Sequence, residues 1–536
     1  MRGRVSPTLP LSAMGLRHLL PACLHCPIVL HCSSGAVGIP PTCPHVRGCG
    51  RYTRRDNTIA WQDSSRVEYV QKPQSVVLLV ADSLRWDTVH AGGVHGLPYT
   101  TTHGVSFHQA RAAGCWTLPA TASLFTGLMP HQHGATAQTR SMRHDVPTLA
   151  ECMHALGYTP HMVSANVVTT HIFGLHRGFE NIERVWHLTP GQHKQLHTLL
   201  VLLGKPRLRR QLYSLDFVLR KMSEDLEAAK IWLQSTYEVV FARARTILRT
   251  AASRGQRVFC FLNLMETHFP YHVADTFQTL AGDFWGWLRE LYSLYHFVNQ
   301  TWMIRDKTYV SPDMLWQLRQ RQRQAWERMA PSVDAFIQEV REHYGALVVF
   351  GADHGDNFGD QGWQYHFSNV TDAGTRVPLF WLPHDHDDRR VIALPVSTRD
   401  VFGALLHAVG ERQPSRFSLT ETPERSVPIM QSYWYNNRGR TRACFRYNQF
   451  AFVAEHQRFV HRQNQWHTAP ITQGDEPELP FEPMGMAVCP FKENIDTLAR
   501  LACVQEAFAQ YSAFSSRLMR TPPGRHPAFR GAKQTR

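Results

Sequence analysis

The sequence lacks the long apolar run that a membrane-spanning helix needs, because no stretch of 18 or more apolar residues occurs in its 536 residues. Arg2 and Arg4 precede an apolar stretch that Pro and His interrupt, which makes a poor signal peptide. Cysteine is also scarce, and the six cysteines beyond residue 50 are scattered, which suits a reducing compartment. These absences favour a cytoplasmic location.

Acidic residues are missing from both ends of the chain. Residues 1–55 hold seven arginines and residues 517–536 hold five arginines and one lysine, so the two ends account for thirteen of the fourteen net positive charges. The body is therefore nearly neutral, and no nucleic acid partner is expected. A basic end can touch phosphate or a membrane surface, but solvated, disordered tails are the preferred interpretation.

The amino-terminal segment also holds five of the eleven cysteines. Cys23 and Cys26 have the spacing of half a zinc site, but no second well-spaced pair follows them. We interpret residues 1–72 as a disordered basic extension, or as the result of a start codon assigned too far upstream.

From residue 73 apolar strands alternate with helical stretches, as a mostly parallel sheet requires. The pattern predicts strands at 75–81, 161–165, 257–264, 346–351 and 378–382, and helices at 119–127, 147–156 and 238–253. Amphipathic stretches near 190–250 and 277–343 are interpreted as helical insertions around the mouth of a site. Residues 431–516 are expected to form a small subdomain with strands at 442–447, 450–454 and 459–462 and a helix at 494–518, before a basic tail at 517–536.

Two of the predicted strands end in residues that bind metals. The apolar run at 346–351 leads into Asp353 and His354, and the run at 75–81 leads into Asp82. Ligands beyond the carboxyl ends of strands are where open α/β sheets place their chemistry. An unpaired carboxylate there would be costly without a cation. A helix cap or a loop ion pair is the alternative for each residue.

The segment Gly114–Gly127 places hydroxyl groups on a Pro-containing turn that leads into a predicted helix. A helix amino terminus offers free N–H groups and positive potential to an anion. A Thr117 hydroxyl at this turn, beside metals held by Asp and His, has the chemistry of a nucleophile for phosphoryl or sulfuryl transfer. An N-cap threonine is the structural alternative.

These segments resemble the sulfatase branch of the alkaline phosphatase superfamily, from about residue 73 to about residue 385. The resemblance rests on five matches in the family's order: the two strand ends, the nucleophile turn with its helix (116–134), the histidine motif at 265–271, and the strand at 376–379 after His366. It implies a three-layer α/β/α sandwich with a mostly parallel central sheet, helical insertions and a small carboxyl-terminal α+β part.

One departure from the family pattern bears on the chemistry. Family sulfatases carry a cysteine, oxidised to formylglycine, in a Cys-x-Pro-x-Arg turn, whereas this turn reads Thr117-Leu118-Pro119-Ala120-Thr121. Cys115 lies two residues too early and has no Pro two residues after it. The family members with Thr here resemble phosphodiesterases, phosphonate hydrolases and phosphoethanolamine or glycerol-phosphate transferases, which favours phosphorus over sulfur.

The resemblance assigns Asp82, Asp353, His354, His366 and the Thr117 oxygen as metal ligands. A mixed Asp and His set suits Zn or Mn better than Ca, with one or two ions. Many sulfatases have a second Asp after the first, where this chain has Ser83.

Other residues near these motifs receive secondary roles. His268 and His366 are candidate catalytic residues, for a second metal, the substrate's oxygens or the leaving group. Glu266 is a candidate second-site ligand. Asp356, Asp360 and His272 are candidate supporting partners, and a structural or surface role is expected for the following residues: Thr121, Ser123, His131, His133, His384 and His386.

The sequence therefore predicts a metal-dependent hydrolase or transferase, for example a phosphodiesterase, that uses a Thr117 nucleophile on a phosphate or phosphonate ester. Its partner would be a small-molecule, lipid or sugar ester. A sulfuric ester hydrolase is the alternative of the same class, and a catalytically silent anion-binding protein is the alternative of another class. The oligomeric state stays open.

Overall fold

The computed structural model describes residues 53–55, 58–60, 69–71, 73, 75–90, 94, 96–185, 236–269, 271, 311–366, 369–410, 419–420, 423, 426–434, 447–454, 457–471, 482–483 and 495–520. The chain divides into two units, residues 1–55 with 59–69 and residues 56–58 with 70–536. Three short strands, β1 (Thr53–Arg55), β2 (Thr58–Ala60) and β3 (Tyr69–Gln71), form a sheet of their own. Most of the predicted extension at 1–72 lies outside the described residues.

The centre of the second unit is an eight-stranded sheet. In spatial order its strands are β13 (Arg390–Ser397), β5 (Val105–Arg111), β12 (Leu379–Leu382), β9 (Ala346–Gly351), β4 (Ser75–Ala81), β8 (Arg257–Leu264), β6 (Tyr158–Ser164) and β7 (Asn181–Arg184). Strand β12 runs antiparallel to both of its neighbours, and the other neighbouring pairs are parallel. The predicted mostly parallel sheet is confirmed.

The central strands form where the sequence has continuous apolar runs. Every residue of β4 and of β9 is buried, as expected for parallel strands covered on both faces. Strands β4, β8 and β9 have the predicted limits, and the ranges predicted at 161–165 and 378–382 correspond to β6 and β12. Strands β5, β7 and β13 were not predicted, because their polar residues break the apolar runs.

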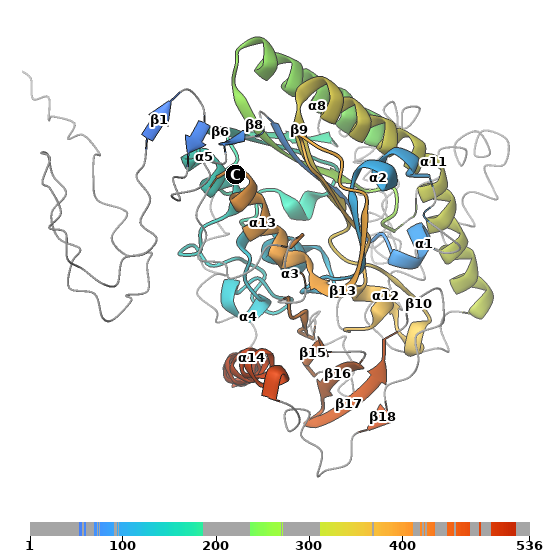
Figure 1. The fold of residues 1–536 in the computed structure, drawn as a ribbon. Helices are drawn as coiled ribbons and strands as arrows, with labels where there is room; N and C mark the ends of the chain where they lie inside the picture. The colour runs from blue at the N-terminus through green and yellow to red at the C-terminus, as the bar shows by residue number, and fades with distance from the viewer. Residues whose placement is uncertain are drawn as a thin grey trace, which may run out of the picture. The chain divides into compact units, whose positions relative to one another are not determined.

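Helices cover both faces of the sheet (Figure 1). On one face Trp326 of α11 (Pro312–Tyr344) stacks on Phe350 of β9, with ring centroids 5.9 Å apart. On the other face Phe125 of α3 (Thr117–Thr126) packs edge-on against Phe261 of β8 at 4.8 Å. Among the described residues around this sheet, the other α-helices are α1 (Trp86–His90), α2 (Pro98–His103), α4 (Pro130–His133), α5 (Leu149–Ala155), α8 (Thr236–Ser253), α12 (Asp372–Thr375) and α13 (Val401–Ala408). The arrangement is the expected three-layer α/β/α sandwich.

The two ranges predicted as insertions are described only in part, by α8 and by residues 312–343 of α11. Both helices contribute buried side chains to the hydrophobic core. Ser311 caps the start of α11 by accepting a hydrogen bond from the Met314 N–H, and Gly345 at φ 53° ends it. Trp326 and Val333 on this helix are fully buried.

The carboxyl-terminal part holds a five-stranded antiparallel sheet and a long helix. The strands are β14 (Ile429–Ser432), β15 (Gln449–Ala454), β16 (Gln457–Arg462), β17 (Gln465–Pro470) and β18 (Glu482–Pro483), and the helix is α14 (Ile495–Arg520). Phe450 of β15 packs against Phe508 of α14 with ring centroids 5.2 Å apart. Of the predicted strand at 442–447, residues 442–446 lie outside the described residues. Across the described helices, none combines the length and the apolar character that crossing a membrane demands.

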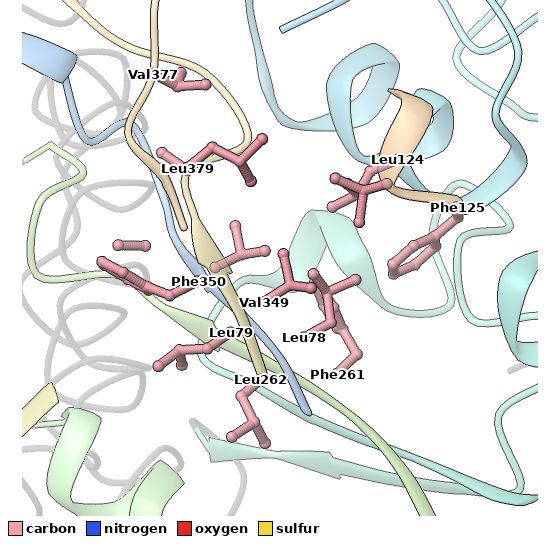
Figure 2. Close-up of a cluster of buried hydrophobic side chains, with 14 of the residues drawn as sticks. Leu78, Leu79, Leu124, Phe125, Phe261, Leu262, Val349, Phe350, Val377 and Leu379 are labelled. Atoms are coloured by element: carbon pink, nitrogen blue, oxygen red, sulfur yellow. The ribbon is translucent and has the colours of Figure 1, made fainter. Parts of the chain in front are cut away.

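The hydrophobic core runs through all three layers. Figure 2 shows Leu78 of β4, Leu262 of β8 and Val349 of β9 together with Phe125 of α3. These strands are therefore held rigidly up to their carboxyl ends, where the polar residues begin.

Phe350 offers a test of this core, since its ring lies between Trp326 and Phe380. We expect Phe350→Ala to lower the free energy of unfolding by about 3–5 kcal/mol, because it leaves a cavity between two layers. Denaturant unfolding followed by tryptophan fluorescence would measure the loss. Trp316→Ala is the matched control, because Trp316 lies on α11 with 63% of its surface exposed, and it should change the stability by less than about 0.5 kcal/mol. Equal losses would contradict the packing described.

Candidate active site

The ends of the two central strands bring two carboxylates and an imidazole together. Strands β4 and β9 are parallel neighbours, with Val80 opposite Gly351. Asp82, Asp353 and His354 follow directly and are buried, and they offer ligand atoms that all lie within 4.8 Å of one another. The backbone N–H of Asp82 donates to the Leu264 carbonyl at 2.9 Å, which ties this end to β8 as well.

Thr117 reaches the same point from α3. Its Oγ1 lies 3.5 Å from Asp82 Oδ2 and 3.4 Å from His354 Nε2. Thr117 is the first residue of the helix, and the extended Trp116 occupies the capping position without a side-chain hydrogen bond. The structure therefore does not use Thr117 as an N-cap. Close packing fixes the turn, since a Cβ on Gly114 would lie 2.8 Å from Pro119 Cβ.

The donor set fits a divalent metal ion. His354 Nε2 lies 3.6 Å from an oxygen of Asp82 and 3.6 Å from Asp353 Oδ2, which is too long for a hydrogen bond. Ligands about 2.1 Å from a tetrahedral ion would lie roughly 3.4 Å from one another, which agrees with these separations and with the Thr117 contacts. Asp353 Oδ2 is buried and has no hydrogen-bond partner in the described part of the chain.

The orientation of His354 supports the same conclusion. Its Nδ1 lies 2.8 Å from the Gly355 carbonyl, which can only accept, so Nδ1 carries the proton. The lone pair of Nε2 then points toward Asp82 and Asp353. A backbone carbonyl is one of the groups that commonly fix a metal-binding imidazole in this way.

Burial and mutual charge interactions shift the pKa values of all three groups in the protein without metal. Burial, followed by the charge of Asp82, raises the pKa of Asp353 to about 7. Burial alone would raise the pKa of Asp82. The charges of the nearby His268 and His354 outweigh burial, so the pKa of Asp82 lies below its ordinary value. Burial alone would lower the pKa of His354. The charges of Asp353 and Asp82 outweigh burial, so the pKa of His354 lies above its ordinary value.

A second group of aromatic and acidic side chains adjoins this cluster. The ring of His366 lies 4.6 Å from that of His354 and 5.2 Å from that of His268, between centroids. Asp356 accepts from His366 Nδ1 at 3.2 Å and from the Tyr271 hydroxyl at 2.7 Å. Burial raises the pKa of Asp356 to about 6. His366 and His268, the two candidate catalytic histidines, therefore lie beside the cluster of Asp82, Asp353 and His354.

Arg85 holds the loop that carries these residues. Its guanidinium pairs with Asp87 at 2.7 Å and with Asp360 at 2.8 Å, and it donates to the Asp356 carbonyl at 3.0 Å. Asp360 thus supports the loop through Arg85, while Asp356 contacts His366 directly. Close packing also restricts the loop, because a Cβ on Gly355 would lie 2.1 Å from the Ala373 carbonyl oxygen. His272 lies outside the described residues.

Several other candidates lie away from the cluster or have structural contacts. The Glu266 carboxylate accepts hydrogen bonds from the Thr236 hydroxyl and the Tyr237 N–H, so it caps α8 instead of joining the ligands. His133 accepts the Ala135 N–H at 3.0 Å and contacts Ser123 Oγ at 3.0 Å. The other structural or surface candidates are Thr121, buried in α3, His131, which contacts Gln431, and His384 and His386, which contact Asp385.

Sequence reasoning did not identify Asn166. This residue follows β6, and its Nδ2 donates to Asp82 Oδ2 at 2.6 Å and to Thr117 Oγ1 at 3.4 Å. The signal was the same as for the aspartates, since Asn166 stands just beyond the carboxyl end of a strand. Asparagine is common in turns, so its position in the sequence does not distinguish a functional residue from a turn residue.

Comparison with known proteins places this geometry in a family. The Sulfatase family model matches residues 74–411, and the chain belongs to this family. It is similar in fold to the phosphonate monoester hydrolase of Silicibacter pomeroyi, with a TM-score of 0.52, 16% identity, and coverage of 82% of this chain and 95% of that one. The phosphonate monoester hydrolase of Agrobacterium radiobacter gives a TM-score of 0.54, 15% identity and coverage of 82% and 96%. None of the curated proteins matches the sequence. Family and fold make the chain a sulfatase-superfamily hydrolase.

The raised pKa of Asp353 predicts a pH-dependent metal affinity. Below pH 7 a proton must be displaced before Asp353 can bind a cation, so the affinity of the stripped protein for Zn²⁺ or Mn²⁺ should fall by at least about tenfold per pH unit. Calorimetric titration between pH 5.5 and 8 would measure it.

We expect Asp353→Asn to abolish stoichiometric binding in the same titration. Asp385→Asn, in the exposed acidic loop, is the control and should bind like the wild type. Binding that is retained in Asp353→Asn, or that does not vary with pH, would contradict this site.

Proposed function

We propose that the protein is a metal-dependent hydrolase or transferase that acts on phosphate or phosphonate esters through Thr117. The observation that carries the proposal is the position of Thr117 Oγ1, which lies within 3.5 Å of both Asp82 and His354 at the start of α3. The family resemblance places the formylglycine-forming cysteine of sulfatases at this point. A threonine there supplies a hydroxyl oxygen directly.

The chain's residues support a two-step transfer. Thr117 would release its hydroxyl proton to solvent and attack phosphorus in line through Oγ1. An Oγ1–P bond forms as the ester P–O bond breaks, and the departing oxygen takes up a proton to leave as the alcohol. Water or an acceptor alcohol would then take the phosphoryl group and return the threonine. The free N–H groups of the first turn of α3 favour the negative oxygens of the bound ester.

Asp82, Asp353, His354 and the Thr117 oxygen would hold a divalent ion, Zn or Mn in preference to Ca. When bound, the ion supplies positive charge that lowers the pKa of the attacking hydroxyl and stabilises the negative charge of the transition state. His366 is a further candidate ligand, for the same ion or for a second one, because its ring is 4.6 Å from that of His354.

His268 and His366 would act on the oxygens of the ester. Asp356 holds Nδ1 of His366, and the Phe269 carbonyl lies 2.7 Å from Nδ1 of His268, so both rings have fixed orientations. A ring held in this way can donate a hydrogen bond to a non-bridging oxygen or protonate the leaving group.

We prefer a phosphorus ester to a sulfate ester because of the residues in the turn at 115–121. Cys115 is buried and lies outside the position of the nucleophile, and Thr121 occupies the place of the family's arginine. Two proteins of similar fold carry the name phosphonate monoester hydrolase, which agrees with this choice. The substrate would be a small-molecule, lipid or sugar ester.

An ester panel tests the proposal. Metal-loaded protein would be assayed with an aryl phosphate, a bis-aryl phosphate, an aryl phosphonate and an aryl sulfate. We expect turnover of a phosphorus ester, and a loss of at least about 10³-fold in kcat/KM for Thr117→Ala, because the nucleophile is removed. Turnover of the sulfate alone would favour a sulfuric ester hydrolase, and no turnover by metal-replete protein would favour a silent anion-binding protein.

Two controls separate the nucleophile from its surroundings. Thr121→Ala removes a buried hydroxyl one turn further along α3 and should retain most of the activity. Cys115→Ala should also remain active, because no formylglycine is formed from it. Loss of activity in Cys115→Ala, with Thr117→Ala active, would reverse the assignment.

A further inference from the structure

The turn after β6 points one amide group at the centre of the proposed site. Asn166 is 4% exposed, and its Nδ2 lies 2.6 Å from Asp82 Oδ2 and 3.4 Å from Thr117 Oγ1. The residue therefore touches the proposed nucleophile and a proposed metal ligand with the same nitrogen. An amide nitrogen has two hydrogens, one for each contact.

The orientation of this amide is determined by its other hydrogen bonds. Asn166 Oδ1 accepts the Val168 N–H at 2.8 Å, which caps the short 3₁₀ helix η1 (Val167–Thr169). If the amide were flipped, its NH₂ group would face the Val168 N–H, and its oxygen would face the Asp82 carboxylate. Both pairs would be repulsive, so the NH₂ group must face Asp82 and Thr117.

The backbone around Asn166 is held as firmly as its side chain. Ser164 Oγ accepts the Asn166 N–H at 2.9 Å, and Thr169 Oγ1 donates to the Asn166 carbonyl at 2.9 Å. The Ala165 N–H donates to the Asn263 carbonyl of β8 at 3.2 Å, which ties the turn to the sheet. The amide is therefore prepositioned before any substrate binds, which is the condition for efficient electrostatic stabilisation.

A donor fixed at this point has a defined chemical consequence. Because the amide nitrogen can only donate, the lone pairs of Thr117 Oγ1 receive its hydrogen, and the oxygen is favoured when it carries negative charge. Negative charge develops on Oγ1 in the second step, when the Oγ1–P bond breaks and the electron pair returns to the threonine oxygen. The 3.4 Å contact is long, as catalytic hydrogen bonds often are before the substrate binds.

We propose that Asn166 is a further catalytic residue, which donates a hydrogen bond to Thr117 Oγ1 and stabilises it as nucleophile and as leaving group. The inference rests on the proposed function, because it requires Thr117 to be the attacking residue. The contact with Asp82 Oδ2 orients that carboxylate for the metal, so Asn166 links the two parts of the site.

Asn166→Ala and Asn166→Asp test this role in the full-length, metal-loaded protein. Aspartate caps a helix as well as asparagine does, so Asn166→Asp keeps the acceptor for the Val168 N–H but has no donor for Thr117. We expect both variants to lower kcat by about 10²-fold with a change in KM of less than about threefold. A bis-aryl phosphate has a good leaving group, which keeps the first step fast and makes the second step limiting. Slowing of the second step should therefore raise the fraction of chains that carry a phosphoryl group after acid quenching, as measured by intact mass.

Thr170→Val is the matched structural control. It removes a buried hydroxyl that donates to the Val167 carbonyl at 2.8 Å in the same turn, without touching Asn166 or Thr117, and it should keep kcat and the phosphorylated fraction near those of the wild type. The metal content and melting temperature of all variants would be measured in parallel. If Asn166→Asp is as active as the wild type, or if the activity of the Asn166 variants falls only in proportion to their metal content, the inference is wrong.

Thr117→Ala distinguishes a failure of the proposed function from a failure of the inference about Asn166. If Thr117→Ala retains turnover, the proposed function fails and the inference fails with it. If Thr117→Ala is inactive while the Asn166 variants are fully active, only the inference about Asn166 is overturned.

Discussion

The burial of two carboxylates side by side is the constraint on which the rest of the site depends. Asp82 and Asp353 follow adjacent strands and are buried, and burial, followed by the charge of Asp82, raises the pKa of Asp353. Such a pair is unfavourable in the folded protein unless positive charge lies between them. A divalent ion would supply this charge, since the two carboxylates and the Nε2 lone pair of His354 form a donor set that fits one.

The sheet makes this arrangement possible because three of its strand ends carry polar side chains to one point. Strands β4, β9 and β6 deliver Asp82, Asp353 and Asn166, while α3 begins at Thr117 on one face of the sheet. The hydrophobic layers on both faces keep these ends in register. Arg85 and the tight packing of Gly355 then hold the loop after β9, so the histidines beyond it have fixed positions.

Membership of the sulfatase family and departure from its nucleophile combine into one interpretation. The fold follows the family, whereas the sequence resemblance aligns Thr117 with the cysteine that becomes formylglycine in sulfatases, and for this reason we propose a threonine nucleophile. A threonine oxygen on phosphorus gives an intermediate whose breakdown releases the threonine again. In the proposed chemistry a donor such as Asn166 would stabilise the threonine oxygen, because the same oxygen would serve as nucleophile and as leaving group.

The sequence by itself determined the central strands and the Asp and His side chains that follow them, because an apolar run that stops at Asp or His is typical of a buried strand that opens into a polar site. It also predicted the helix that begins at the Thr117 turn, because this turn and helix are local in the chain. Only the tertiary structure decided the roles of Asn166 and Glu266. Each stands next to a strand end, and the partner of each is far away in sequence: Asn166 meets Asp82, while Glu266 turns away to cap α8. The local sequence pattern predicts where a residue lies relative to a strand, whereas the packing between elements determines which groups its side chain contacts.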